Sequence, residues 1–529
     1  MAASDPDALI EAGTQAYRMR NYKEAAEQFR AAAKADPTSI TAQVGLVRSD
    51  INAGVLVEAT QIAEALVKSY PNSAAAHAAM GDVAFRRSMM PEAEKEYLGA
   101  IKLDKTEGRA YYGLAILYSA YSLHRRAYDF FTIAHAYSPS DPDIENSWLY
   151  RLPRKQRLAE FEKLAASSGL DKTTAENYKL AIQQIKAIDN LPAHACKLAA
   201  PVERAEIHLQ PLMYNAKILR EWGLRVGVND HFSSLVLDTG AGGITLSSKA
   251  AAKAGVVKLA DTRVRGIGDQ GVANPYVGYA KTIKIGGLEF HDCIVDVIDT
   301  NRWLDVDGLI GTDVFAKYIV DIDFPVETMR LLPLPKDPEA GGEVAGLDSH
   351  EQPSDVDSES TDPKVIRSRY HDRYVAPEMQ KWSRFYRSGH MILLPTFVNH
   401  KPEHLFLVDT GASRNLLSNN FAQEITSVSK DNFGRIGGIS GEVKDVYTAR
   451  KAEMQFANFK TKDFDLTTID LSGISESAGT EVSGIIGFEL LRMLEMKIDY
   501  RDGLIDFTFD RDKLEIKNLN NLKSFLDMH

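Results

Sequence analysis

Residues 235–241 read Leu-Val-Leu-Asp-Thr-Gly-Ala, and residues 406–412 read Phe-Leu-Val-Asp-Thr-Gly-Ala. In both copies an apolar run typical of a β-strand leads into an acidic residue, Asp238 or Asp409. The glycine that follows lets the backbone turn sharply beside the acid. Each copy therefore predicts a loop that presents one carboxyl group. Two such loops brought face to face would hold two carboxyl groups around one water molecule.

The similarity between the two copies extends beyond the acids. A glycine-rich stretch follows each acid, at residues 266–268 and 437–438. A later phrase reads Gly-Leu-Ile-Gly at 308–311 and Gly-Ile-Ile-Gly at 484–487, and an acid stands 12 residues after the last glycine of each. This order indicates the internal duplication of a lobe of about 120 residues.

On these residues the chain resembles the aspartic proteases, and in particular the retropepsin-like family. The resemblance covers roughly residues 215–333 and 380–512. It implies two closed β-barrel lobes, each with a hairpin flap, facing each other in one chain in the manner of pepsin-like enzymes. The alternative, in which each lobe pairs with a lobe of a second chain, stays open. With the helical repeats described below, the expected fold class is multidomain α plus all-β.

The resemblance assigns the catalytic role to Asp238 and Asp409. The threonines of the two loops are expected to form hydrogen bonds across the junction between the lobes, and the glycines to let backbone N–H groups approach the acids. A hydroxyl side chain in the second loop is expected to orient Asp409 and to make it the more readily ionised acid. The residues that support the catalytic loops are Thr239, Gly240, Thr410, Gly411 and Ser413.

The glycine-rich stretches are expected to form flaps that bend over an extended substrate, exclude water and open again. Strand-like runs flank both stretches, at 279–285 and 446–454. The alternative is that they are ordinary hairpin turns. The residues expected to bind substrate are Gly266, Ile267, Gly268, Gly437, Gly438 and Ile439.

The first part of the chain repeats every 34 residues. Pro37, Pro71, Lys105 and Pro139 mark this interval, and alanine occupies positions 25, 59, 93 and 127. The pattern resembles tetratricopeptide repeats, with about four repeats between residues 5 and 140 and helical caps as far as residue 190. Such a module offers a surface for a substrate or a protein partner, with Tyr17, Tyr111, Tyr112 and Arg109 near it. The alternative is a spacer or a dimerisation arm.

Composition limits the remaining function classes. The chain has 529 residues, 44% hydrophobic and 26% charged, which is ordinary for globular domains. The net charge of −11 argues against a nucleic-acid binder, and no apolar run is long enough to cross a membrane. The expected domains are a repeat domain at 5–190, lobe 1 at 200–333, an acidic flexible linker at 334–375 and lobe 2 at 376–529.

No metal or cofactor is expected. The acidic linker lacks the spacing of an EF-hand, and Pro402 separates His400 from His404. Cys196 and Cys293 either form a disulfide or stay free. The N-terminus shows no signal peptide, which is compatible with a cytoplasmic start. A removed signal and a periplasmic or secreted protein are the favoured alternative.

The sequence therefore predicts an aspartic endopeptidase with an attached repeat module, acting on a protein or peptide through a water activated between Asp238 and Asp409. A non-catalytic peptide-binding or scaffold protein is the alternative function. An enzyme with narrow processing specificity is a third possibility.

Overall fold

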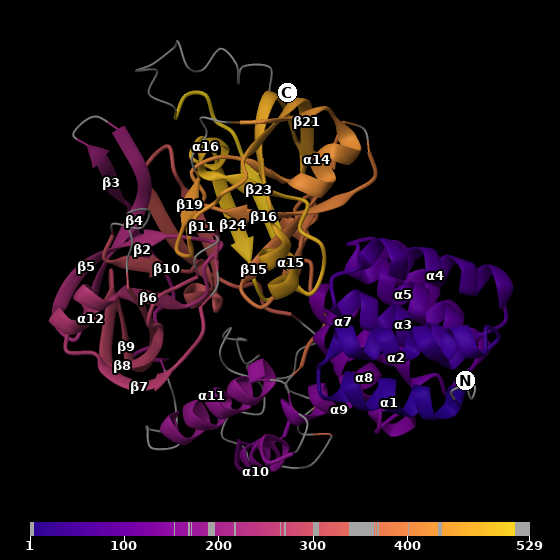
Figure 1. Cartoon of the computed structure of the whole chain (residues 1–529). Helices are drawn as coiled ribbons and strands as arrows, with labels where there is room; N and C mark the ends of the chain where they lie inside the picture. Colours follow the sequence, from indigo (N-terminus) through magenta and orange to yellow (C-terminus); the bar gives the residue numbers. More distant parts are fainter. Residues whose placement is uncertain are drawn as a thin grey trace. The chain divides into compact units, whose positions relative to one another are not determined.

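The computed structural model divides the chain into two compact units (Figure 1). The helical unit comprises Met1–Ile185 and Pro353–Asp372, and the β unit comprises Lys186–Gln352 and Arg373–His529. Each unit is described by itself. The structure describes residues 5–152, 154–167, 170, 172–188, 196–215, 218–264, 266–268, 271–299, 306–337, 364, 367, 370–399, 401–431 and 436–513.

Eight helices form four helix pairs in the helical unit. The first helices of the pairs begin 34 residues apart, and so do the second helices, which confirms the predicted repeat. The helices are α1 (Pro6–Arg18), α2 (Tyr22–Ala35), α3 (Ile40–Asn52), α4 (Leu56–Ser69), α5 (Ala74–Arg86), α6 (Met90–Leu103), α7 (Gly108–Ala120) and α8 (His124–Tyr137).

Glycines and aromatic rings set the distance between neighbouring helices. A Cβ atom at Gly45 would lie 2.5 Å from the ring of Phe29, and one at Gly113 would lie 2.2 Å from the ring of Tyr97. Both rings are almost completely buried. An aromatic ring of one repeat therefore fills the space that a glycine of the next repeat leaves open, and a larger residue at either glycine would push the two repeats apart.

Three further helices follow the four pairs: α9 (Pro142–Leu149), α10 (Arg154–Ala165) and α11 (Lys172–Ile188). Helix α9 keeps the 34-residue interval and begins after the N-cap Asp141, whose carboxylate accepts hydrogen bonds from two backbone N–H groups. Ile144 of α9 is fully buried against α7 and α8. Helices α10 and α11 pack together through Phe161 and Tyr178.

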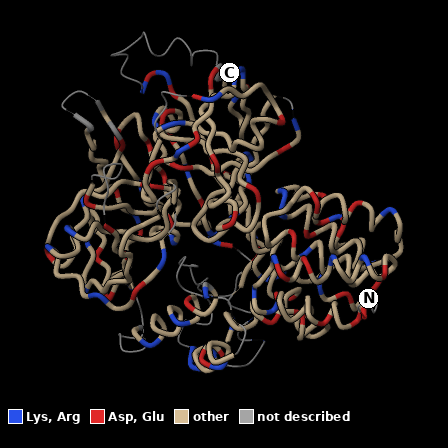
Figure 2. Tube along the Cα trace, in the orientation of Figure 1, with Lys and Arg blue, Asp and Glu red and all other residues tan. Residues whose placement is uncertain are grey.

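A half-buried carboxylate at the start of α9 joins helices that are far apart in the sequence. Asp143 accepts hydrogen bonds from Tyr17 at 2.8 Å, Arg48 at 2.9 Å and Arg109 at 2.6 Å. Burial opposes its ionisation, but the guanidinium groups of Arg109 and Arg48 hold the pKa of Asp143 well below its usual value. Tyr17 and Arg109, expected to lie near a partner surface, thus bind helix α9 of the same chain. Figure 2 shows that acidic and basic residues both occur throughout the helical unit.

The contacts of Asp143 with Tyr17, Arg48 and Arg109 predict that a substitution of nearly equal size at Asp143 lowers the stability of the helical unit. Asp143→Asn keeps the shape but removes the charge, which leaves Arg48 and Arg109 in a buried site without their full counter-charge. We expect the free energy of unfolding of the helical unit to fall by about 2–3 kcal/mol, measured by urea unfolding followed by far-ultraviolet circular dichroism. Glu27→Gln, at an exposed position of α2, is the control. Equal stability of the two variants would contradict this role.

The β unit contains two barrels, each closed by a ring of six strands (Figure 1). In lobe 1 the ring runs through β9 (Leu288–Ile298), β6 (Ile244–Ser247), β10 (Gly308–Ile310), β5 (His231–Leu237), β4 (Ile218–Val228) and β8 (Tyr276–Ile285). In lobe 2 it runs through β15 (Met391–Val398), β16 (His404–Asp409), β23 (Gly484–Gly487), β17 (Leu416–Ser418), β22 (Phe459–Ile469) and β21 (Tyr447–Phe456).

A third sheet joins the two lobes. Its central strands are β11 (Tyr318–Asp323) of lobe 1 and β24 (Glu495–Asp499) of lobe 2, which pair antiparallel with Ile319 opposite Asp499. The outer strands are β12 (Thr328–Pro333), β2 (Ala205–His208), β25 (Leu504–Thr508) and β13 (Ser383–Arg384). A single cluster of buried apolar side chains extends from this sheet into both barrels, so the two lobes share one core.

Two features lie at the borders of the β unit. A disulfide joins Cys196, just before β1 (Lys197–Leu198), to Cys293 in the middle of β9. Residues 370–372, within the expected linker 334–375, contact α8 in the helical unit: Arg125 donates a hydrogen bond to the carbonyl of Tyr370 at 3.0 Å. Residues 338–363 of that linker lie outside the described residues. No helix in the described part of the chain is long and apolar enough to span a bilayer.

A buried acid in the sheet between the lobes predicts the pH dependence of stability. Burial, and then the charge of Asp502, raises the pKa of Asp499 to about 7. The native state therefore keeps a proton that the unfolded chain releases near pH 4, and stability falls as pH rises from 4 towards 8.

Asp499→Asn imitates the protonated acid and should remove this part of the pH dependence. We expect the wild-type protein to lose on the order of 2–4 kcal/mol more than the variant between pH 4.5 and pH 8, measured by urea unfolding. Asp465→Asn, at an exposed position of β22, is the control. A variant with the wild-type pH profile would exclude Asp499 as the source.

Candidate active site

Strands β5 and β16 carry Asp238 and Asp409 to the junction between the lobes. Strand β5 pairs in parallel with β10, and β16 pairs in parallel with β23. These pairings hold the start of each acid loop in place. The Oδ1 atom of Asp238 accepts hydrogen bonds from the N–H groups of Gly240 at 2.8 Å and Ala241 at 3.1 Å. Asp409 is held in the same way by Gly411 and Ala412, at 2.9 and 3.0 Å.

The threonines of the two loops exchange hydrogen bonds across the junction. The N–H group of each threonine donates to the hydroxyl of the other at 3.0 Å. The hydroxyl of Thr239 then donates to the carbonyl of Val408, and that of Thr410 to the carbonyl of Leu237, both at 2.7 Å. Because each hydroxyl contacts the backbone beside the opposite acid, the four bonds fix the separation of the two carboxyl groups.

The glycines of the loops have no room for a side chain. A Cβ atom at Gly240 would lie 2.6 Å from Cγ of Asp409, and one at Gly411 would lie 2.5 Å from Cγ of Asp238. Each acid therefore packs against the backbone of the opposite loop. Any larger residue at these two positions would force the carboxyl groups apart.

The two acids differ in electrostatic environment. Burial raises the pKa of Asp238 well above its usual value, and the charge of Asp409 and a hydrogen bond between the two carboxyl groups raise it further. Burial also raises the pKa of Asp409, but Asp409 accepts hydrogen bonds from Asp238 and from the N–H groups of Ala412 and Gly411, which oppose the rise. A shared proton is therefore favoured on Asp238, and the pair titrates as a unit.

The sequence attributes this difference to Ser413, but the structure places its side chain in solvent. Among the hydrogen bonds of the described residues, none joins Ser413 to Asp409. Two other residues do act on the acids. Glu221 of β4 is buried, and its charge raises the pKa of Asp409. His390 lies beside the loop of Asp238, and its charge lowers the pKa of that acid. No sequence motif identifies Glu221 or His390, because each residue acts on the loop of the opposite lobe and lies far from that loop in the sequence.

Comparison with known families agrees with this geometry. Two stretches of the chain, residues 224–314 and 395–490, match the aspartyl protease family, and each includes one Asp-Thr-Gly loop. The two lobes are aspartyl protease family domains. In the helical unit, residues 16–83 match the tetratricopeptide repeat family.

Individual proteins are similar to shorter parts of the chain. The UBA domain-containing protein Mud1 of Schizosaccharomyces pombe is 31% identical over 110 residues, which is 20% of this chain and 32% of Mud1, so the chain spans about a third of that protein's length. A tetratricopeptide repeat protein of Thermus thermophilus, TTC0263, is 18% identical with a TM-score of 0.26, covering 34% of this chain and 99% of TTC0263. MamA of Desulfovibrio magneticus is 20% identical with a TM-score of 0.21, covering 26% of this chain and 77% of MamA.

The glycine-rich stretches of the two aspartyl protease domains contact each other. The N–H group of Ser440 donates to the carbonyl of Ile267 at 3.1 Å. Strands β19 (Gly437–Gly438) and β20 (Gly441–Glu442) form a small hairpin in lobe 2. Its tip residue Ile439 lies over Gly266 and packs against an apolar cluster of lobe 1.

The expected flap residues thus fall into two tips that meet each other. Gly268 has a φ angle of +125°, and a Cβ atom there would lie 2.4 Å from the backbone of the opposite tip. This position therefore requires glycine for both its conformation and its space.

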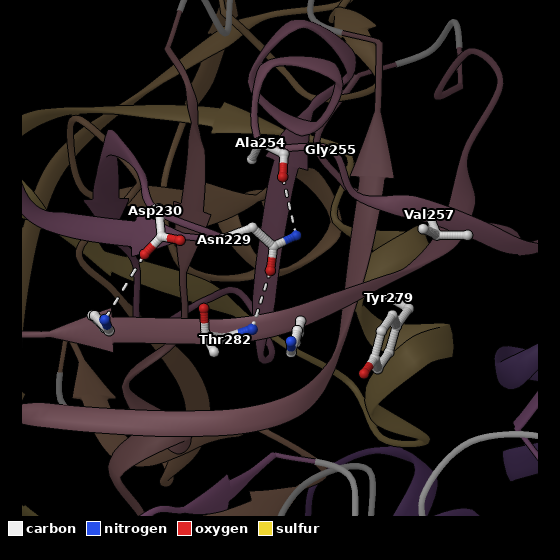
Figure 3. Close-up of a pocket in the computed structure, with 9 residues that line it drawn as sticks. Asn229, Asp230, Ala254, Gly255, Val257, Tyr279 and Thr282 are labelled. Atoms are coloured by element: carbon white, nitrogen blue, oxygen red, sulfur yellow. Dashed lines mark hydrogen bonds and ion pairs between the residues drawn. The ribbon is translucent and has the colours of Figure 1, made fainter.

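A pocket of about 520 Å³ lies elsewhere on lobe 1, beside the β4–β5 turn (Figure 3). Asn229 in this turn donates to the carbonyl of Ala254 at 3.0 Å and accepts from the N–H group of Thr282 at 3.1 Å. None of its lining residues belongs to an Asp-Thr-Gly loop. Across the described residues, no three His, Cys, Asp or Glu side chains gather in a group able to hold a metal ion.

The hydrogen bonds between Thr239 and Thr410 predict that a substitution at either threonine destabilises the β unit. Thr410→Val removes a hydroxyl that makes one hydrogen bond as donor and one as acceptor, and it leaves the N–H group of Thr239 and the carbonyl of Leu237 buried without them. We expect the free energy of unfolding of the β unit to fall by about 2–3 kcal/mol, measured by urea unfolding. Thr508→Val, at an exposed position of β25, should change it by less than about 0.5 kcal/mol. Similar effects of both substitutions would contradict the inference.

Proposed function

We infer that the protein is an aspartic endopeptidase that hydrolyses peptide bonds with a water molecule activated between Asp238 and Asp409. The observation that supports this most is the pair itself: two buried carboxyl groups from separate lobes, hydrogen bonded to each other and held by matching backbone donors. Like charges so close cannot both ionise readily, so the pair retains one proton at mildly acidic pH. One member then acts as base while the other acts as acid.

The chemistry follows from this division of roles. Asp409, as the ionised member, takes a proton from the water, which attacks the carbonyl carbon of the scissile bond. Asp238 donates its proton to the carbonyl oxygen, and a tetrahedral gem-diol forms. Transfer of a proton to the amide nitrogen then breaks the C–N bond and releases the amine. No covalent intermediate with the protein is required.

The two flap tips complete the proposed site. Their mutual contacts close them against each other, and the bond from Ser440 to Ile267 breaks when they separate. An extended peptide would lie between the tips and the acids, and backbone groups of the tips would bind its main chain as an adjacent strand does. The tips thereby exclude water during the reaction and open to release product.

The repeat module is proposed to bring a protein substrate or partner to the protease lobes. Tetratricopeptide repeats are protein-binding modules. The side chains of Tyr17 and Arg109 are engaged with Asp143, so they contribute to holding the repeats together in this structure. The disulfide between Cys196 and Cys293 supports an oxidising compartment for the β unit, such as the periplasm or the cell exterior.

Digestion of a mixed peptide library between about pH 3 and pH 7 tests the proteolytic function. We expect the wild-type protein to cut peptides, and Asp238→Asn and Asp409→Asn each to lower kcat/KM by about 10²–10⁴-fold. Product peptides are quantified by mass spectrometry. Asp465→Asn, which removes an exposed carboxylate from the same unit, should retain wild-type activity.

Two results would reject the proposal. Cleavage that persists in both active-site variants would come from a contaminating protease. A wild-type protein that cuts nothing in the library, and nothing among the proteins captured by its repeat module, would leave the alternative of a non-catalytic peptide-binding scaffold.

A further inference from the structure

His390 reaches from lobe 2 to the catalytic loop of lobe 1. It follows Gly389 in the turn between β14 (Tyr386–Ser388) and β15, and its side chain is half-buried. Its Nε2 atom lies 3.1 Å from the carbonyl oxygen of Gly240, so Nε2–H is the donor. A Cβ atom at Gly242 would lie only 2.6 Å from its Nδ1 atom. The absence of a side chain at Gly242 therefore makes room for the imidazole ring.

The contact with Gly240 is linked to Asp238 through one peptide group. The carbonyl of Gly240 and the N–H group of Ala241 belong to the same peptide, and that N–H group donates to Oδ1 of Asp238 at 3.1 Å. Donation from His390 polarises the peptide and strengthens the second hydrogen bond. A protonated imidazole is the stronger donor. The two hydrogen bonds through the Gly240–Ala241 peptide thus favour the ionised form of Asp238 when His390 carries a charge.

The other ionisable groups around this contact are few. Asp313 accepts a hydrogen bond from the N–H group of Gly243 at 3.0 Å, and Arg387 donates to the carbonyl of Tyr500 at 3.2 Å. Tyr500 interacts electrostatically with Asp313, Arg387 and Asp238. Burial raises the pKa of Tyr500 far above neutral pH, and arginine keeps its charge throughout. Of the two cationic side chains in this group, His390 and Arg387, the histidine is therefore the one that a change of pH can neutralise.

The corresponding position of lobe 1 holds a different residue. Gly223 of β4 lies opposite Val236, and Leu393 of β15 lies opposite Leu407, which are the residues two before each acid. Counting back three residues from Gly223 and Leu393 gives Arg220 and His390. The duplication therefore places a residue of fixed charge at one position and a titrating residue at the other.

We propose that His390 is a positioning residue that, when protonated, stabilises ionised Asp238 through the Gly240–Ala241 peptide and so sets the alkaline limit of activity, where the acid of the pair loses its proton. This inference rests on the proteolytic function proposed above. It gives the two chemically identical acids different responses to pH, because no titrating histidine stands at the equivalent position of lobe 1.

The test compares His390→Gln, which keeps an N–H donor but no titrating charge, with His390→Arg, which keeps the charge. The pH dependence of kcat/KM is measured from pH 3 to pH 8. We expect the alkaline limb of the profile, where Asp238 loses its proton, to move up by about 0.5–1 pH unit in His390→Gln and to stay near the wild-type position in His390→Arg. His291→Gln, on β9 beside Glu289, is the control and should leave the limb unmoved.

An unmoved alkaline limb in His390→Gln would overturn the inference while leaving proteolysis intact. A purely structural role would lower activity equally at every pH, and this result would also overturn it.

If the wild-type protein cuts nothing, the proposed function fails. The coupling between His390 and Asp238 is then tested by a measurement that does not require activity. Linkage requires that the imidazole signal of His390 shift when Asp238 ionises in the wild-type protein, and that Asp238→Asn remove this part of the shift. This shift is measured by nuclear magnetic resonance of labelled histidine, with His390→Gln identifying the signal. Identical titration of His390 in the wild-type protein and in Asp238→Asn would exclude the coupling.

Discussion

The site depends on the exchange of hydrogen bonds between Thr239 and Thr410. Electrostatics opposes the arrangement, because two carboxyl groups in a buried place repel each other when both are charged and lose hydration when either is charged. The threonine hydroxyls bind the backbone on the far side of the junction, so the loops cannot separate without breaking four buried hydrogen bonds. Breaking these buried hydrogen bonds costs free energy, which opposes the separation of the two acids.

The sheet between the lobes and the common core provide the rest of the support. Strands β11 and β24 pair along five residue positions, and the apolar cluster runs through this sheet into both barrels. The sheet contains buried acids of its own, of which Asp499 is kept protonated by its surroundings to about pH 7. The β unit thus favours mildly acidic conditions both in its stability and in the retention of a proton by the Asp238–Asp409 pair.

Local sequence was enough to predict the parts that repeat. The two Asp-Thr-Gly phrases and the 34-residue interval identified the lobes and the helix pairs, since each pattern reflects contacts within one repeated element. The role given to Ser413 rested on its closeness in sequence to Asp409, which does not determine where the side chain points. His390 stands 19 residues before Asp409, yet it contacts the loop of Asp238. The contact of Tyr17 with Asp143 leaves no periodic signal, because it joins the first repeat to α9 and has no counterpart in the repeats between them.

Joining both lobes in one chain permits the difference between the acids. In a symmetric homodimer the same residue would stand on both sides of the interface, so a histidine beside one catalytic loop would be matched by a histidine beside the other. Here His390 and Arg220 occupy equivalent positions, and buried Glu221 corresponds to Met391. A covalent link also makes the pairing of the lobes independent of protein concentration. The duplicated chain therefore keeps two equal acids for the chemistry while their unequal neighbours decide which of them holds the proton.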